Sequence, residues 1–177
     1  MKRFNIAYVP KYNPKKFINI SESFHPESYN YNLGESSLPH ITICQFIADE
    51  NEIGQIWNEV CSKIGENGIT LIFNCFSNIS FDEKLFWLSI IPDFNQQLID
   101  TFNTVSKIVT PIRNDAFDPH LTLFNYFPDK LSINFSLEEN INIEEEFELI
   151  LGESDNAGQL KNIIFHFKNQ FTSSLLF

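Results

Sequence analysis

The pentapeptide Pro-His-Ile-Thr-Ile at residues 39–43 recurs as Pro-His-Leu-Thr-Leu at residues 119–123. The chain has four His and seven Thr among 177 residues, so chance would place a Thr two positions after a His well under once. Two such pairs occur, and both follow a Pro and alternate with Ile or Leu. Because nearly half the chain separates the copies, the repeat indicates a duplicated unit and a domain with two lobes.

Within each copy the spacing is that of a β-strand, in which residues two apart point to the same face. His40 and Thr42 would therefore share one face, as would His120 and Thr122, while the Ile and Leu residues between them face the core. If the two strands lie side by side about a pseudo-two-fold axis, the cleft between them holds two imidazoles and two hydroxyls.

This set of groups suits the cleavage of a phosphodiester. Near neutral pH one imidazole can be a neutral base while the other is a protonated acid. The Thr hydroxyls can donate to the non-bridging phosphate oxygens. The sequence has no His-Glu-x-x-His motif and no closely spaced Cys pair, so no metal site and no cofactor are expected. The alternative is that both pairs are ordinary strand residues, which a second matched copy disfavours.

Composition predicts a globular chain with one domain over residues 1–177, since 43% of residues are hydrophobic and 20% are charged. The formal net charge is −11 and the pI about 4.7. Affinity for long nucleic acids depends on Lys and Arg, so no extended nucleic-acid binding is expected. A small phosphorylated substrate in a locally polar cleft stays compatible with the acidity.

The odd number of cysteines (Cys44, Cys61 and Cys75) predicts free, reduced and buried thiols. No apolar run is long enough to span a membrane, and the apolar run at residues 4–9 is too short for the core of a signal peptide. We therefore expect a cytoplasmic monomer without membrane contact.

Periodicity predicts more strand than helix. Strands are expected at residues 4–9, 39–46, 69–77, 84–91 and 119–126, with a closing hairpin over 147–167 and an uncertain strand at 131–137. Helices are expected at 15–20, from Asp49 to 64, and from Asp93 to 109, with Phe94 on the inward face of the last. This order favours an α+β fold with mostly antiparallel pairing.

The two motifs resemble those of the 2H phosphoesterase superfamily, in particular its 2′-5′ RNA ligase-like proteins and 2′,3′-cyclic-nucleotide phosphodiesterases. The segments 69–73 and 85–88, the helix after them and the hairpin at 147–160 are also similar to that family. The resemblance implies a bilobal fold of two mostly antiparallel β-sheets with flanking helices, and a cleft between the lobes. It further implies metal-independent hydrolysis or transfer at 2′,3′-cyclic or 2′,5′ phosphodiesters.

In this resemblance His40 and His120 match the catalytic His, and Thr42 and Thr122 match the hydroxyls that hold the phosphate. Many bacterial relatives carry Arg or Lys shortly after the second motif, where this chain has Phe-Asn-Tyr at 124–126. Together with the acidity, this difference favours a small cyclic nucleotide or a short RNA end with a cyclic phosphate over long RNA.

Two tyrosines are further candidates for substrate binding. Tyr8 lies on the first predicted strand, and simple alternation places Tyr126 on the face of His120 and Thr122. Either ring could stack on a base or fill the sheet. Arg113 could meet a phosphate but is expected at the surface, and Trp87 is expected in the core.

The primary hypothesis is thus a metal-independent phosphodiesterase that acts on 2′,3′-cyclic nucleotides, or on related cyclic or 2′,5′ phosphodiesters, through His40 and His120. One alternative is an RNA-end processing enzyme with 2′-5′ ligase-like activity. Another is a non-catalytic module that holds a nucleotide without turning it over.

Overall fold

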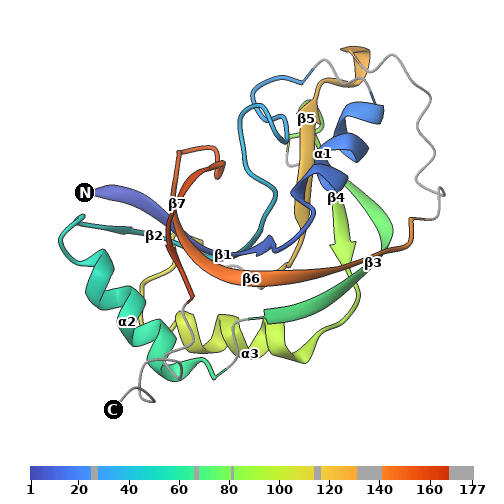
Figure 1. Ribbon diagram of the computed structural model, residues 1–177. Helices are drawn as coiled ribbons and strands as arrows, with labels where there is room; N and C mark the ends of the chain where they lie inside the picture. Colours follow the sequence, from blue (N-terminus) through green and yellow to red (C-terminus); the bar gives the residue numbers. More distant parts are fainter. Residues whose placement is uncertain (25–27, 66–67, 81, 114–116, 131–140, 168–177) are drawn as a thin grey trace.

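A curved β-sheet with helices at its two ends forms the described part of the computed structural model, which covers residues 1–24, 28–65, 68–80, 82–113, 117–130 and 141–167 (Figure 1). The elements in chain order are β1 (Lys2–Pro10), α1 (Pro14–Ser23), β2 (Ile41–Ala48), α2 (Ile53–Lys63), β3 (Gly68–Ser80), β4 (Phe86–Pro92), α3 (Gln96–Val105), β5 (Leu121–Tyr126), a short 3₁₀ turn (Pro128–Lys130), β6 (Ile143–Ser154) and β7 (Leu160–His166). The strand expected at 131–137 lies outside the described residues.

All strand pairs among the described residues are antiparallel, in the order β2-β1-β6-β3-β4-β5, with β7 paired to β6. The α+β class with mostly antiparallel strands is therefore confirmed. The expected division into two sheets is not seen, since one hydrogen-bonded sheet runs through both halves. The reason is the length of β3, whose first part, Gly68–Phe73, pairs with β6 and whose second part, Phe73–Ser80, pairs with β4.

The strand order has a two-fold pattern. The motif strands β2 and β5 stand at its two ends, and each follows a strand and a helix, as β1–α1–β2 and β4–α3–β5. Each helix packs on the motif strand of the other half, because α1 contacts β5 while α3 contacts β2 (Figure 1). The curved sheet and these crossed contacts bring the two ends of the strand order, β2 and β5, against each other.

Aromatic side chains build much of the core. Phe17 of α1 is fully buried and packs against Phe73 of β3 and Phe147 of β6, with ring centroids 5.7 Å away in both cases. These contacts join α1 to the centre of the sheet, where β3 and β6 pair. Burial of such large rings is a major contribution to folding stability.

The start of α3 differs from the prediction. Asn95 caps the helix, since its side chain accepts a hydrogen bond from the backbone N–H of Leu98 at 3.2 Å. Asp93 lies two residues earlier, and Phe94, expected to face inward, is 81% exposed. Phe94 precedes the first helical turn, so the helical periodicity that predicted its burial does not apply to it.

The three cysteines are free and differ in exposure. Cys44 is buried and Cys61 half-buried, and burial raises the pKa of their thiols to about 12 and about 11. Cys75 is exposed, so the expectation of a buried thiol is wrong there, because its side chain lies on the open face of β3. None of the described helices is long and apolar enough to cross a membrane.

Candidate active site

Both motifs open onto one cavity of about 420 Å³, which is lined by His40, Thr42, His120 and Thr122. Each His is the residue directly before its strand, and each Thr is the second residue of that strand. The structure thus brings together the four motif residues singled out in the sequence. Their catalytic and binding roles stay predictions.

The two imidazoles are held in the same way. Nδ1 of His40 lies 2.8 Å from the carbonyl oxygen of Leu38, and Nδ1 of His120 lies 2.8 Å from that of Asp118. A carbonyl only accepts hydrogen bonds, so Nδ1 carries the proton in both rings. In a neutral ring the lone pair then belongs to Nε2, the nitrogen required for proton transfer.

The surroundings of the two rings differ. His40 is 5% exposed, and its burial, assisted by the nearby His120, lowers its pKa to about 4. Backbone contacts with Leu38 and Gly158 act in the opposite direction and are outweighed. His120 keeps 31% of its side chain exposed, and its Nδ1 lies 3.8 Å from a carboxylate oxygen of Asp118. His40 is therefore neutral at pH 7, while His120 stays partly open to solvent beside a carboxylate.

Each motif strand carries a β-bulge directly after its Thr. The pairing passes from Ile6↔Cys44 to Ala7↔Thr42 on one side, and from Leu88↔Phe124 to Ser89↔Thr122 on the other. One extra residue, Ile43 or Leu123, therefore stands in each motif strand. Such bulges reverse the alternation of side chains beyond them, which moves the next cleft-facing residue by one position.

The bulge in β5 explains why Tyr126 does not lie on the face that simple alternation predicted. Tyr126 does not line the cavity; it is buried, its ring packs against Phe86 and Phe124, and its hydroxyl accepts a hydrogen bond from Asn78 at 2.9 Å. The extra residue at Leu123 turns Tyr126 to the face opposite Thr122.

Tyr8 is also placed away from the cavity. It is fully buried in β1, and its hydroxyl lies 3.2 Å from that of Thr101 in α3. Burial raises the pKa of its phenol. Tyr8 belongs to the core face of β1 because the β1 residues Phe4 and Ile6 that alternate with it are also in the core. The structure therefore gives it a packing role where the sequence suggested a base contact.

Aromatic side chains that the sequence did not single out form the walls of the cavity. Trp87 and Tyr31 line it and pack edge-on at 5.7 Å, while Phe117 lines it stacked on Phe102 at 4.5 Å. Trp87 had been expected in the core. Its position two residues before Ser89, which faces Thr122, could have been recognised only once the β4–β5 register was known.

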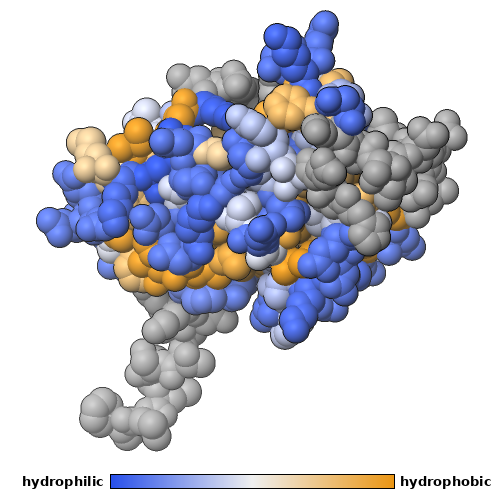
Figure 2. Space-filling model, turned by 90° about the horizontal axis from the view of Figure 1, so that it is seen from above, coloured by the Kyte–Doolittle hydropathy of each residue, from blue (hydrophilic) through white to orange (hydrophobic). Residues whose placement is uncertain are grey.

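The charge of the cavity is sparse. Arg113 is exposed, as expected, and it also lines the cavity, where it is the one Lys or Arg among the described lining residues. One guanidinium is enough to meet a single phosphate group. Figure 2 shows that one face of the molecule is mainly hydrophilic, with hydrophobic residues exposed between the polar ones.

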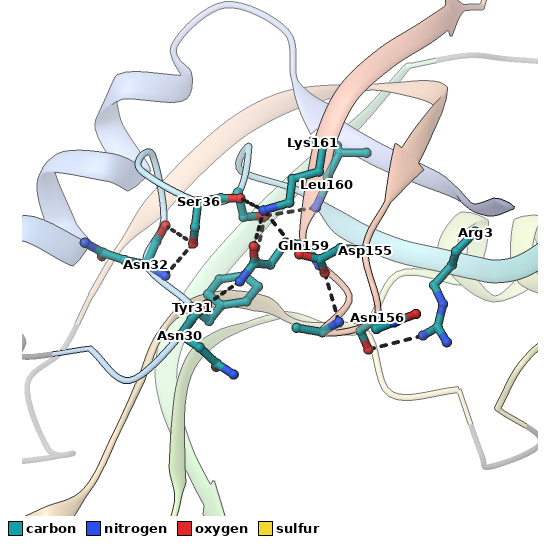
Figure 3. Close-up of polar contacts among 12 residues, drawn as sticks. Arg3, Asn30, Tyr31, Asn32, Ser36, Asp155, Asn156, Gln159, Leu160 and Lys161 are labelled. Atoms are coloured by element: carbon teal, nitrogen blue, oxygen red, sulfur yellow. Dashed lines mark hydrogen bonds and ion pairs between the residues drawn. The ribbon is translucent and has the colours of Figure 1, made fainter.

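The turn between β6 and β7 closes one side of the cavity, where Ala157 and Gly158 line it. The carboxylate of Asp155 accepts hydrogen bonds from the backbone N–H groups of Ala157 and Gln159. It also forms an ion pair with Lys161 at 3.2 Å. Figure 3 shows this turn tied to the loop that precedes the first motif, since Lys161 donates to the carbonyl of Ser36 at 2.8 Å.

A second tie in Figure 3 joins the side chain of Gln159 to the carbonyl of Asn30, next to Tyr31. On its other side Tyr31 is held by β5, because its backbone N–H donates to the side chain of Asn125 at 2.9 Å. The cavity wall at Tyr31 is thus held both by the β6–β7 turn and by β5.

No family model and no curated protein sequence matches the chain. Solved structures do match it. Escherichia coli LigT in complex with 3′-AMP is 16% identical over 93% of this chain and 96% of that chain, with a TM-score of 0.61. The MHV ns2 PDE domain is 12% identical over 86% and 99%, with a TM-score of 0.54.

Kluyveromyces marxianus Usb1 is 11% identical over 92% of this chain and 95% of that chain, with a TM-score of 0.55. At sequence identities this low, the structural match establishes the fold and leaves the activity open. The chain therefore shares the fold of LigT, the MHV ns2 PDE domain and Usb1.

Proposed function

We propose that this protein is a phosphodiesterase that opens 2′,3′-cyclic nucleotides, or a related cyclic or 2′,5′ phosphodiester, by acid–base catalysis with two histidines. The observation that carries the proposal is the matched pair His40 and His120. Both line one cavity, and both are held through Nδ1 by a carbonyl two residues earlier, which makes Nε2 available for proton transfer.

The different surroundings of the two rings support a division of roles. His40, buried and neutral, takes a proton from the attacking water as its oxygen bonds to phosphorus. His120, beside Asp118, gives a proton to the ribose oxygen as its bond to phosphorus breaks. The product is a nucleoside monophosphate, and exchange with solvent resets both rings. Thr42 and Thr122 donate to the non-bridging oxygens.

The shape and charge of the cavity support a small nucleotide as the substrate. Trp87, Tyr31 and Phe117 offer aromatic surface for a base, and Arg113 offers one cation for one phosphate. The net charge of −11 opposes binding of a long polyanion. LigT, of the same fold, is seen with 3′-AMP, the kind of product this reaction would form.

The proposed mechanism assigns both proton transfers to imidazole, so no metal ion takes part in it. Among the described residues no group of three or more His, Cys, Asp and Glu is placed to hold a metal ion. Activity is therefore expected to persist in EDTA. Loss of activity with chelator, restored by a divalent cation, would contradict the mechanism.

The test is hydrolysis of the four 2′,3′-cyclic nucleotides in EDTA by the wild type, His40→Ala, His120→Ala and His166→Ala. His166 is exposed and bound to Glu148, so it is a matched control outside the cavity. Each motif variant is expected to lose at least about 10²-fold in kcat, and the control almost nothing.

Other outcomes would select the other readings. Faster turnover of oligonucleotides with a cyclic phosphate end than of mononucleotides would favour RNA-end processing. Tight nucleotide binding by a folded wild type with no product formed would favour a binding module, and would overturn the proposed activity.

A further inference from the structure

Each motif threonine has a polar neighbour on the adjacent strand. The Nδ2 group of Asn5, on β1, donates to the hydroxyl of Thr42 at 3.1 Å. The hydroxyl of Ser89, on β4, donates to that of Thr122 at 3.4 Å. Since β1 and β4 hold equivalent places in the strand order, the two halves of the fold make the same contact with different side chains.

The bulges explain why the two side chains differ. Ser89 stands directly opposite Thr122, so a short hydroxyl reaches it. In the other half, Ala7 stands opposite Thr42, and Asn5 lies two residues before Ala7 on the same face of β1. A longer amide is needed to span that diagonal. Both neighbours are buried, which holds their side chains in place.

The direction of these hydrogen bonds matters for the hydroxyls. A Thr hydroxyl has one proton to donate and two lone pairs that accept. An amide nitrogen can only donate, so Thr42 must accept from Asn5 and keeps its own proton for another partner. Among the described residues neither Thr42 nor Thr122 donates its hydroxyl proton, and both line the cavity.

Packing alone does not account for Asn5. Its Oδ1 atom is buried and has no hydrogen-bond partner among the described residues, although the side chain is fully buried. An amide oxygen left unpaired in the interior is unfavourable, and an apolar residue of similar size would avoid that cost. A polar group kept at such a position is typical of a functional site.

We propose that Asn5 and Ser89 are positioning residues, which occupy the acceptor side of Thr42 and Thr122 and so direct both hydroxyl protons into the cavity toward a phosphate. The inference rests on the proposed function, in which those hydroxyls hold the non-bridging oxygens. Asn5 is not among the residues that line the cavity, whereas Ser89 lines it beside Thr122. In this proposal each of them acts through its threonine, and any loss from Ser89→Ala that persists in Thr122→Val would instead indicate direct contact of Ser89 with the substrate.

This dependence gives a test by double-mutant cycles. Asn5→Ala and Ser89→Ala are each made alone and together with Thr42→Val and Thr122→Val, and kcat is measured with a 2′,3′-cyclic nucleotide. Each single Ala variant is expected to lose about five- to tenfold in kcat, the worth of one hydrogen bond. In a protein that already carries Thr42→Val, Asn5→Ala is expected to cause no further loss of kcat. In the same way, Ser89→Ala is expected to cause no further loss of kcat in Thr122→Val.

The crossed pairs are the controls. Asn5→Ala with Thr122→Val, and Ser89→Ala with Thr42→Val, join residues from different halves, so their losses are expected to multiply. A merely structural role would make Asn5→Ala equally harmful whether or not Thr42 is present, and that result would overturn the inference. Thermal unfolding checks each variant, and the Ser89 cycle decides the matter if Asn5→Ala does not fold.

Binding of inorganic phosphate, measured by calorimetry, separates failure of the inference from failure of the proposed function. If the wild type binds phosphate but turns over no cyclic nucleotide, the proposed function fails, and the same cycles are read in phosphate affinity. A wild type that neither binds phosphate nor turns over substrate would overturn both. Turnover with no coupling within either pair would overturn this inference alone.

Discussion

The carbonyl oxygen of Leu38 lies 2.8 Å from Nδ1 of His40 and holds its ring in place. His40 is only 5% exposed. The contact fixes the tautomer, and the burial lowers the pKa of the ring to about 4. His120 makes the same contact with Asp118 but stays open to solvent and near a carboxylate. Two motifs of the same pattern thus hold their rings in different surroundings.

The first prediction concerns the pH dependence of turnover. If His40 is the base, it must be neutral, so kcat/KM is expected to hold from pH 7 downward and to fall only as the pH passes through about 4. Initial rates between pH 3.5 and 8, with activity regained on return to pH 7, measure this limb. An acid limb centred near pH 6.5, the ordinary value for imidazole, would contradict the assignment of His40 as the buried base.

The second prediction concerns stability. The folded-state pKa of His40 lies below its unfolded value, so only the unfolded chain takes up this proton between pH 6.5 and 4, and stability falls across that window. His40→Gln removes this titrating group. As the pH is lowered through the window, the free energy of unfolding of His40→Gln is therefore expected to fall less than that of the wild type, and the two losses are expected to differ by about 3 kcal/mol. Urea unfolding at pH 7 and pH 4 measures the difference.

His166→Gln is the matched control for this experiment, because His166 is exposed and lies outside the cavity. It is expected to follow the wild type far more closely than His40→Gln does. Parallel pH dependence in the wild type and His40→Gln would mean that the His40 ring is protonated in the folded protein.

The third prediction uses the two tryptophans of the chain. Trp57 is in the core, stacked on Phe165 at 6.4 Å, while Trp87 lines the cavity. In Trp57→Phe, the emission of Trp87 is expected to be quenched by a nucleoside 3′-monophosphate as the base stacks on the indole. Inorganic phosphate, which has no base, is expected to change it little. Equal quenching in Trp87→Phe would place the base elsewhere.

Much of the sheet could be predicted from the sequence because strand alternation and the two motifs are local signals. The strands that contain residues 4–9, 69–77 and 119–126 are found close to their predicted bounds. The prediction that His40 and Thr42 share one face depends only on regular extended backbone from His40 to Thr42, and the bulge comes just after Thr42. The four motif residues could therefore be predicted together.

The remaining features depend on partners that the sequence does not name. Tyr126 was assigned by counting alternate residues from Thr122, and a single extra residue at Leu123 reverses that count. Trp87 reads as a core residue until β4 is known to pair with β5. The single sheet has the same origin, because nothing local in residues 68–80 reveals that the strand pairs with two different neighbours.

The fourth prediction tests the packing role that the structure indicates for Tyr8. Its hydroxyl pairs with that of Thr101, and both groups are buried. Tyr8→Phe leaves the Thr101 hydroxyl without its partner, so the free energy of unfolding is expected to fall by about 1 kcal/mol, with kcat and KM unchanged. Thr101→Val added to Tyr8→Phe removes the second polar group and is expected to recover much of that loss. A rise in KM with unchanged stability would instead return Tyr8 to the substrate, where the sequence first suggested it.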